Sequence, residues 1–185
     1  MAKQGGNLAV RKNATFFFKL DIDRDGAVEK SDFTLGAQRM ARELGHAAGS
    51  PGEKRLLEAL DRVWAAYWAP ADTDGDGVVN LFEYLGALQA MSAADPSGFK
   101  TGADSVAELQ FKALDNDDDG RISVREYVAY ISSWGGARSE AEVAFALLDS
   151  DHDGAITKAE WTKHLWDYHT SEDASVVGNW IYAGH

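Results

Sequence analysis

The amino-acid sequence of 185 residues predicts an all-α, compact protein in which four helix–loop–helix units pair as two lobes. Two observations support this fold class. A twelve-residue pattern occurs four times, at residues 21–32, 72–83, 115–126 and 149–160. Apolar side chains recur at the same offsets before and after every repeat, which is typical of the inward-facing stripe of an amphipathic helix.

The flanking positions locate the helices on either side of each repeat. An aromatic residue stands four positions before each repeat, an apolar residue stands one position before it, and a second aromatic residue follows it directly. In chain order these residues are Phe17, Leu20 and Phe33; Trp68, Ala71 and Tyr84; Phe111, Leu114 and Tyr127; and Phe145, Leu148 and Trp161. We therefore expect helices near residues 8–20, 30–45, 53–69, 81–92, 103–114, 124–134, 139–148 and 158–168.

Each repeat has the spacing of a calcium-binding loop. Positions 1, 3 and 5 are Asp, position 6 is Gly and position 12 is Asp or Glu, as in the EF-hand loop D-x-[DN]-x-[DN]-G-x₅-E. Calcium is a hard cation that takes several oxygen ligands, and the glycine permits the sharp turn that brings short Asp side chains together. Position 7 contributes its backbone carbonyl. The expected metal ligands are Asp21, Asp23, Asp25, Ala27, Asp32, Asp72, Asp74, Asp76, Val78, Glu83, Asp115, Asp117, Asp119, Arg121, Glu126, Asp149, Asp151, Asp153, Ala155 and Glu160.

The four loops are not equivalent. Loop one ends in Asp32, which is one methylene shorter than Glu and reaches the ion with both oxygens only if the loop contracts. Contraction favours Mg²⁺, so we expect site one to bind calcium less selectively than sites three and four, although Glu29 at position 9 can add a carboxylate. Loop two has its full ligand set but is entered through Pro70, a poor residue for the last turn of a helix. We expect three or four calcium ions, with Mg²⁺ competing chiefly at loop one.

Local signals predict how the units begin and pair. Position 8 of each loop is β-branched, so we expect short antiparallel ladders that join loop one to loop two and loop three to loop four. The paired residues would be Val28 with Val79 and Ile122 with Ile156. The expected helix starts are Ser50 before Pro51, Asn80 before Glu83, and the boxes Ser123-x-x-Glu126, Thr157-x-x-Glu160 and Ser139-x-x-Glu142.

The chain is expected to divide between the second and third loops. Residues 1–94 hold the first pair of units, residues 95–185 hold the second pair, and a turn-rich connector over 95–102 joins them. Residues 169–185 form a C-terminal tail. Its apolar side chains argue against a free tail, so we expect it to pack on the body; they are Val176, Val177, Trp180, Ile181 and Tyr182.

Composition excludes several classes of protein. The formal net charge is −12 and the pI is near 4.7, which argues against nucleic acid and anionic membranes as partners. Ligand positions of the loops account for about half of the 30 acidic residues, so this charge is suited to neutralisation by cations. The chain has no cysteine, no visible signal peptide and no apolar run long enough to span a membrane. Catalytic motifs are also absent, so we expect a protein that is not an enzyme. We also expect the protein to be monomeric and cytoplasmic.

The repeats and the tail resemble those of the sarcoplasmic calcium-binding proteins, and of the related calerythrin and calexcitin. Three features carry the resemblance: the uneven loop spacing, the loop-one segment 21–26 with Asp32-Phe33, and the C-terminal segment 165–184. The resemblance implies a compact two-lobed fold and calcium buffering in the cytosol. Members commonly have one disabled loop, often the second, whereas here loop two keeps its ligands.

Two other functions remain open. A calcium sensor that binds a target protein usually exposes a Met-rich groove. This chain has three Met, at positions 1, 40 and 91, against six Trp, eight Phe and six Tyr, and stiff aromatics favour a fixed core. The fold also resembles that of coelenterazine-type photoproteins and luciferin-binding proteins, which hold an apolar ligand between their lobes. Residues that could line such a cavity, or simply belong to the core, are His164, Trp166, Tyr168, His169, Trp180 and Tyr182.

Overall fold

The computed structural model describes residues 8–94 and 96–183, which form eight α-helices, four short strands and three irregular helical turns. The α-helices are α1 (Leu8–Leu20), α2 (Lys30–Glu43), α3 (Pro51–Val63), α4 (Leu81–Ala94), α5 (Pro96–Leu114), α6 (Val124–Ser133), α7 (Arg138–Leu148) and α8 (Lys158–Thr170). The strands are β1 (Ala27–Glu29), β2 (Val78–Asn80), β3 (Arg121–Ser123) and β4 (Ala155–Thr157), and the turns are η1 (Trp64–Trp68), η2 (Ala69–Ala71) and η3 (Val177–Trp180). The predicted all-α fold class is confirmed.

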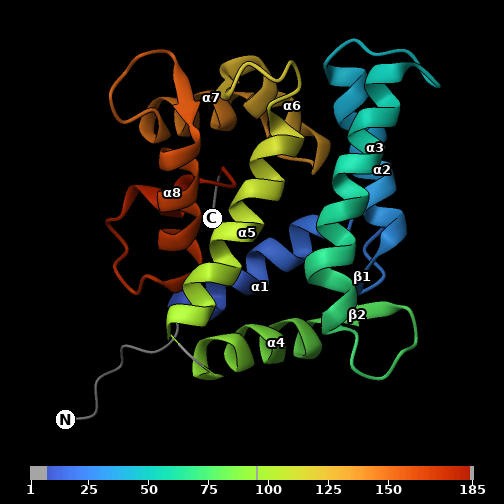
Figure 1. Cartoon of the computed structure of the whole chain (residues 1–185), viewed down its shortest axis with the longest axis vertical. Helices are drawn as coiled ribbons and strands as arrows, with labels where there is room; N and C mark the ends of the chain where they lie inside the picture. Colours follow the sequence, from blue (N-terminus) through green and yellow to red (C-terminus); the bar gives the residue numbers. More distant parts are fainter. Residues whose placement is uncertain (1–7, 95, 184–185) are drawn as a thin grey trace.

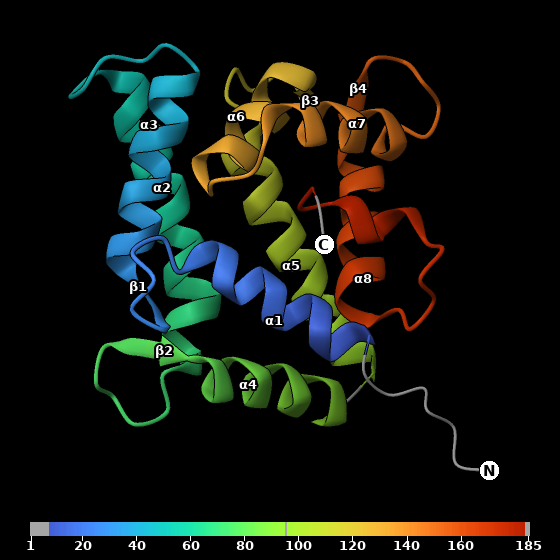
Figure 2. The same cartoon turned by 180° about the vertical axis from the view of Figure 1, so that it is seen from behind.

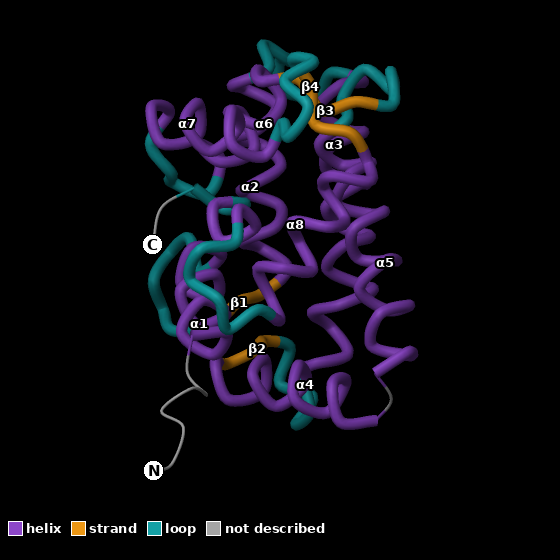
Figure 3. The backbone as a smooth tube through the Cα atoms, turned by 90° about the vertical axis from the view of Figure 1, so that its left-hand side faces the viewer, coloured by secondary structure: helices purple, strands orange, loops and turns teal. Residues whose placement is uncertain are grey.

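The strands form two antiparallel ladders, β1 with β2 and β3 with β4. Val28 lies opposite Val79, and Ile122 lies opposite Ile156, as the loop positions predicted. All four side chains are fully buried. The β3–β4 ladder lies near one end of the long axis and the β1–β2 ladder lies in the opposite half, so the loops of each pair are neighbours while the two pairs are far apart (Figure 3).

Helices from both halves of the chain pack together between these ends (Figure 1). Helix α2 contacts α6, and α5 contacts both α3 and α8. Helix α1 runs across the body from the lower end of α8 towards β1, with α4 below it (Figure 2). The division into residues 1–94 and 95–185 stays a prediction.

The flanking apolar positions form the core. All twelve of them are at most 7% exposed, and Phe17, Leu114, Tyr127, Leu148 and Trp161 are fully buried. Aromatic rings join neighbouring units: Trp68 stacks on Tyr84 with 4.7 Å between ring centroids and an angle of 7° between the planes. Burial of one aromatic stripe per helix therefore stabilises these helices.

The C-terminal tail packs on the body as predicted. Ile181 is fully buried, and the Tyr127 hydroxyl donates a hydrogen bond of 2.9 Å to its carbonyl. The ammonium group of Lys19 donates to the carbonyls of Tyr182 (2.8 Å) and Ala183 (2.6 Å). Of the apolar tail residues, Trp180 is the exception, with 37% of its surface exposed.

The segment before loop two departs from regular helix, as the proline suggested. Helix α3 ends at Val63 and continues as the π-helical turn η1 and then the 3₁₀ turn η2. The Ala69 amide donates to the Trp64 carbonyl, which lies five residues back. Pro70 has no amide hydrogen and its ring obstructs the carbonyl four residues before it, so the chain widens its turn instead of continuing α3.

Two local predictions were wrong. The expected turn-rich connector is largely helical, because α5 begins at Pro96, where the missing amide of proline is harmless and its fixed φ favours a helix; Asp95 lies outside the described residues. Ser139 does not cap α7. That helix begins one residue earlier, at Arg138, after Ala137, so Ser139 lies inside its first turn. The caps at Ser50, Ser123 and Thr157 are present, and the Asn80 side chain accepts the amide of Glu83.

Candidate metal centres

The position-12 carboxylate closes each loop in the same way. Its two oxygens accept hydrogen bonds from the backbone amides of positions 2 and 9, at 2.7 to 3.0 Å. The four carboxylates with their two amide donors are Asp32 with Ile22 and Glu29, Glu83 with Thr73 and Asn80, Glu126 with Asn116 and Ser123, and Glu160 with Ser150 and Thr157. The carboxylate is thus held over the loop from the first turn of the leaving helix.

The position-1 Asp organises the turn. In loop one, the oxygens of Asp21 accept the amides of Asp25 (3.1 Å) and Gly26 (3.0 Å), and Asp115 and Asp149 do the same in loops three and four. The glycine at position 6 has φ between 82° and 94° in all four loops. This left-handed backbone is costly for residues with a Cβ, which explains why this position is glycine.

Position 4 is a second left-handed position, which the sequence reasoning missed. Arg24, Asp118 and His152 have φ of 63°, 58° and 58°, whereas loop two has Gly75 with φ of 76°. In loop two the Gly75 amide, rather than that of Asp76, donates to Asp72, at 2.7 Å. The glycine at position 4 was the available signal that loop two turns differently.

Carboxylate oxygens converge in every loop. In the first pair, oxygens of positions 1, 3 and 5 lie within 4.8 Å of one another; in the second pair, those of positions 1, 3 and 12 do so. The groups are Asp21, Asp23 and Asp25; Asp72, Asp74 and Asp76; Asp115, Asp117 and Glu126; and Asp149, Asp151 and Glu160. These all-oxygen donor sets fit a hard divalent cation such as calcium.

The two carboxylates that close the first pair differ electrostatically. Asp32 is 3% exposed, and this burial raises the pKa of its carboxyl group against the opposing effect of the Glu29 and Ile22 amides. Glu83 is more open, and hydrogen bonds from Asn80 and Thr73 lower its pKa. The shorter carboxylate of loop one is therefore the less favourable place for a negative charge in the absence of a cation.

The remaining predicted positions lie at the expected places in the loops. The position-7 residues Ala27, Val78, Arg121 and Ala155 begin the four strands. Position 9 precedes the leaving helix, where Ser123 and Thr157 accept the amides of Glu126 and Glu160. Both hydroxyls also bond to the same position-12 carboxylate, at 2.7 and 2.8 Å, so they act as helix caps.

The residues considered for an apolar ligand do not form one cavity. Trp166 and His169 line a pocket between the halves. By contrast, His164 is buried beside loop four, where its Nε2 lies 3.1 Å from the Leu148 carbonyl, and Tyr168 donates to the Lys12 carbonyl at 2.7 Å. The other two are Tyr182, which stacks on Phe16, and the partly exposed Trp180; neither lines that pocket.

Known proteins share both the sequence pattern and the fold. The family profile "EF hand" matches residues 107–131 and 142–166. The sarcoplasmic calcium-binding protein of Hediste diversicolor is 30% identical over 129 residues, which are 70% of this chain and 71% of that protein. Calerythrin of Saccharopolyspora erythraea is 24% identical over 120 residues, 64% of this chain and 68% of calerythrin.

Solved structures agree. A calcium-binding protein of Streptomyces coelicolor, described as serving prokaryotic calcium-mediated regulation, has a TM-score of 0.70 at 28% identity and covers 90% of this chain and 99% of its own. The calcium-loaded apo form of the coelenterazine-binding protein of Renilla muelleri has a TM-score of 0.85 at 19% identity over 99% of both chains, which shows a shared fold. The fold and loops define an EF-hand calcium-binding protein. Within that class, the chain belongs to the sarcoplasmic calcium-binding protein family.

Proposed function

We propose that this protein is a cytoplasmic calcium buffer, which takes up calcium without presenting a docking surface to a target protein. The observation that supports buffering is the packing of the two halves against each other. Phe33 of α2 lies edge-on to Trp134 at the end of α6, with 5.5 Å between ring centroids. Phe16 of α1 stacks on Tyr182 of the tail at 4.1 Å.

The contact between α2 and Trp134 is close because Gly36 of α2 has no side chain. A Cβ placed on Gly36 of α2 would lie 2.7 Å from the Trp134 ring. This packing of one half on the other supports a buffer, because a sensor exposes an apolar face when it binds calcium. Met40 is fully buried, whereas Met1 and the side chain of Met91 lie outside the described residues. A fixed aromatic core suits a buffer better than a sensor.

We propose that the four loops bind calcium through the twenty ligands expected from the sequence. The convergence of carboxylates supports all four sites, and the inclusion of Glu126 and Glu160 supports loops three and four most strongly. Loop one carries Asp32, and we propose that Mg²⁺ competes there. A calcium titration measures whether three or four of these sites bind an ion. We further propose that the chain acts as a monomer and has no enzymatic activity, which is supported by relatives that are named as calcium-binding proteins.

The experiment that tests this function combines stoichiometry with apolar exposure. Calcium is titrated calorimetrically with and without millimolar Mg²⁺, and binding of a fluorescent apolar dye is followed in parallel. A buffer is expected to bind three or four ions and to bind the dye only in the metal-free form. Strong dye binding that appears only with calcium would instead support a sensor, the second candidate function.

A ligand carrier is the third candidate. The fold of a coelenterazine-binding protein and an apolar pocket between the halves favour it. However, the pocket volume is about 90 Å³, which is room for roughly one aromatic ring. A luciferin of several rings would need the pocket to widen. Addition of coelenterazine followed by gel filtration tests this: retention of its absorbance with the protein would support a carrier.

A further inference from the structure

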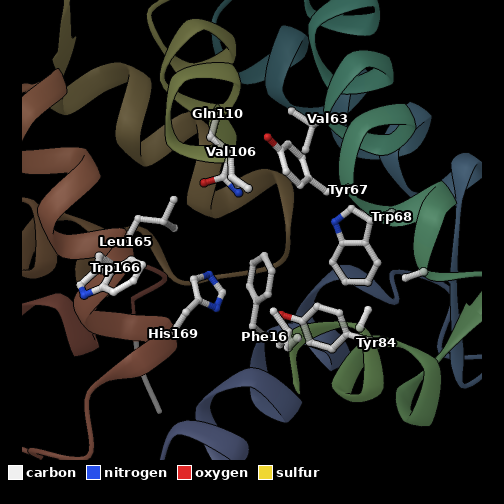
Figure 4. A pocket seen from close by; sticks show the side chains of 13 residues that line it. Phe16, Val63, Tyr67, Trp68, Tyr84, Val106, Gln110, Leu165, Trp166 and His169 are labelled. Carbon is white, nitrogen blue, oxygen red and sulfur yellow. The ribbon is translucent and has the colours of Figure 1, made fainter. Parts of the chain in front are cut away.

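A pocket of about 90 Å³ lies between the two halves of the chain, and Figure 4 shows side chains that line it. Phe16 from α1, Trp68 from η1 and Tyr84 from α4 form an aromatic wall, and Leu165 from α8 faces them. None of the described residues that line the pocket is Asp, Glu, Lys or Arg. The pocket therefore suits a neutral molecule.

One polar group in this wall has an unused acceptor. Gln110 of α5 is only 7% exposed, and its Oε1 has no hydrogen-bond partner among the described residues, although its amide also interacts with the Tyr182 hydroxyl. A buried acceptor without a partner is unfavourable. Figure 4 shows Gln110 at the same end of the pocket as the Tyr67 hydroxyl. Burial raises the pKa of Tyr67, so this hydroxyl stays protonated and can donate.

Two other polar groups of the wall already have partners. His169 Nδ1 is hydrogen-bonded to Asn13 Oδ1, and the Tyr84 hydroxyl donates to that same oxygen at 3.4 Å. A buried water needs two to four polar partners, and the rest of this pocket offers apolar and aromatic surface. The pocket thus has a polar end and an apolar body, which is a better match for an amphipathic organic molecule than for water.

The irregular helix contributes two residues to the pocket. Tyr67 and Trp68, both in the π-helical turn η1, line its wall. Such turns recur at functional sites. Trp68 is also the aromatic residue that precedes loop two, so the pocket is built on the helix that enters a metal loop.

We propose that this pocket binds a neutral molecule with a single aromatic ring and a hydroxyl group, of which phenol is the simplest example. The ring occupies the apolar body between Phe16, Trp68 and Leu165. The hydroxyl donates to Gln110 Oε1 and accepts a hydrogen bond from Tyr67. This binding site is separate from the metal loops and adds a ligand to the proposed calcium buffer.

The test compares phenol with toluene, which has the same ring but no hydroxyl, by isothermal titration in excess calcium. Phenol is expected to bind with one molecule per chain. Gln110→Met, which keeps the size of the side chain, is expected to weaken phenol about tenfold, the loss of roughly one hydrogen bond, and to change toluene binding less than about twofold. Equal weakening of both ligands, or no saturable phenol binding to the wild-type protein, overturns the proposal.

Two variants of α4 test the location. Ala87 lines the pocket and Ala90 lies on the exposed face of the same helix. Ala87→Phe is expected to block both ligands, whereas Ala90→Phe leaves binding unchanged; blocking by Ala90→Phe alone would place the ligand elsewhere and contradict the proposal. Circular dichroism and calcium stoichiometry check that each variant folds. If a variant does not fold, nuclear Overhauser contacts from phenol to the Val63 methyl groups of the wild-type protein decide the location.

Discussion

The guanidinium group of Arg121 in loop three donates a hydrogen bond to the carboxylate of Asp153 in loop four, with 2.5 Å between Nη2 and Oδ2. Arg121 stands at position 7, where only the backbone carbonyl is expected to meet a metal ion, so its side chain is free to reach the neighbouring loop. Asp153 stands at position 5 and is an expected ligand. One loop of the pair thus places a positive charge beside the binding site of the other.

This pair predicts that Arg121 weakens calcium binding at loop four. Arg121→Gln removes a positive charge next to a ligand, and both groups are partly exposed, so the effect is modest. We expect the calcium affinity of loop four to rise about two- to fivefold in a calorimetric titration at low salt. Arg138→Gln, which removes an ion pair with Glu142 away from the loops, is the control. A lower affinity in Arg121→Gln would show that the ion pair instead helps to form the site.

The length of Asp32 predicts the selectivity of loop one. Asp32→Glu allows both oxygens to reach the ion without contraction of the loop, so the preference for calcium over Mg²⁺ should rise. We expect about a tenfold change at this site, equivalent to roughly 1.4 kcal/mol. The converse change Glu126→Asp in loop three should make that site more sensitive to Mg²⁺. Calcium titrations at several Mg²⁺ concentrations measure both, and an unaltered Mg²⁺ effect in Asp32→Glu would refute the role of chain length.

The approach of α2 to Trp134 predicts that Gly36 is required for stability. Gly36→Ala forces the ring or the helix to move, because the new Cβ would lie 2.7 Å from the ring. We expect a loss of about 1–3 kcal/mol in the free energy of unfolding by urea. Gly86→Ala in α4 is the matched control, since nothing lies within 4 Å of its Cβ position, and it should stabilise by up to about 1 kcal/mol. Similar effects of the two substitutions would contradict the packing argument.

A buried lysine holds the tail. Lys12 is 3% exposed, and its ammonium group donates to the carbonyls of Asp167 (3.3 Å) and Ser171 (2.9 Å) and to Asn179 Oδ1 (2.8 Å). Lys12→Met removes the shared donor from all three acceptors, of which the Asp167 carbonyl keeps the Ser171 amide, so we expect a loss of about 2–4 kcal/mol and faster proteolysis of the tail. Lys163→Met, which removes only an exposed pair with Asp167, should cost less than about 1 kcal/mol. A tail that resists protease equally in both variants would rule out this anchoring role.

His169 predicts a dependence of stability on pH. Burial lowers the pKa of His169 to about 3, and the nearby Lys12 ammonium adds to this effect. Since an unfolded histidine titrates near pH 6.5, the unfolded state takes up a proton that the folded state refuses below this pH. The contribution of His169 is therefore complete above about pH 6.5 and is lost as the pH falls. Because part of the residue is accessible to solvent, we expect about 1 kcal/mol less stability at pH 5 than at pH 6.5.

The variant His169→Gln isolates this effect. The free energies of unfolding by urea are measured for both proteins at pH 5 to 7 in excess calcium. Their difference cancels the contributions of the other titrating groups. The wild-type protein should lose stability more steeply than the variant as the pH falls. Parallel pH profiles would mean that the folded protein accepts a proton at His169.

The sequence predicted the features that fixed positions within the loops determine. The caps at Ser123 and Thr157 depend on residues of a single loop. The pairing of Val28 with Val79 joins two loops, and the repeated pattern predicted it because both residues stand at position 8. The prediction that Ser139 caps α7 was wrong because the helix begins at Arg138, only one residue before Ser139. The prediction of a turn-rich connector was wrong because proline and glycine were interpreted as turn signals, although Pro96 also suits the first position of a helix.

By itself, the sequence determined the units: their number, loop boundaries, acidic ligand pattern and buried aromatic stripes. It did so because coordination geometry and helical period both require fixed spacings along the chain. Only the tertiary structure decided which surfaces meet, including Gly36 beneath Trp134, Arg121 beside Asp153, and Gln110 at the end of an apolar pocket. These contacts join residues far apart in the chain or in separate loops, and they depend on how whole helices pack, which no local spacing encodes.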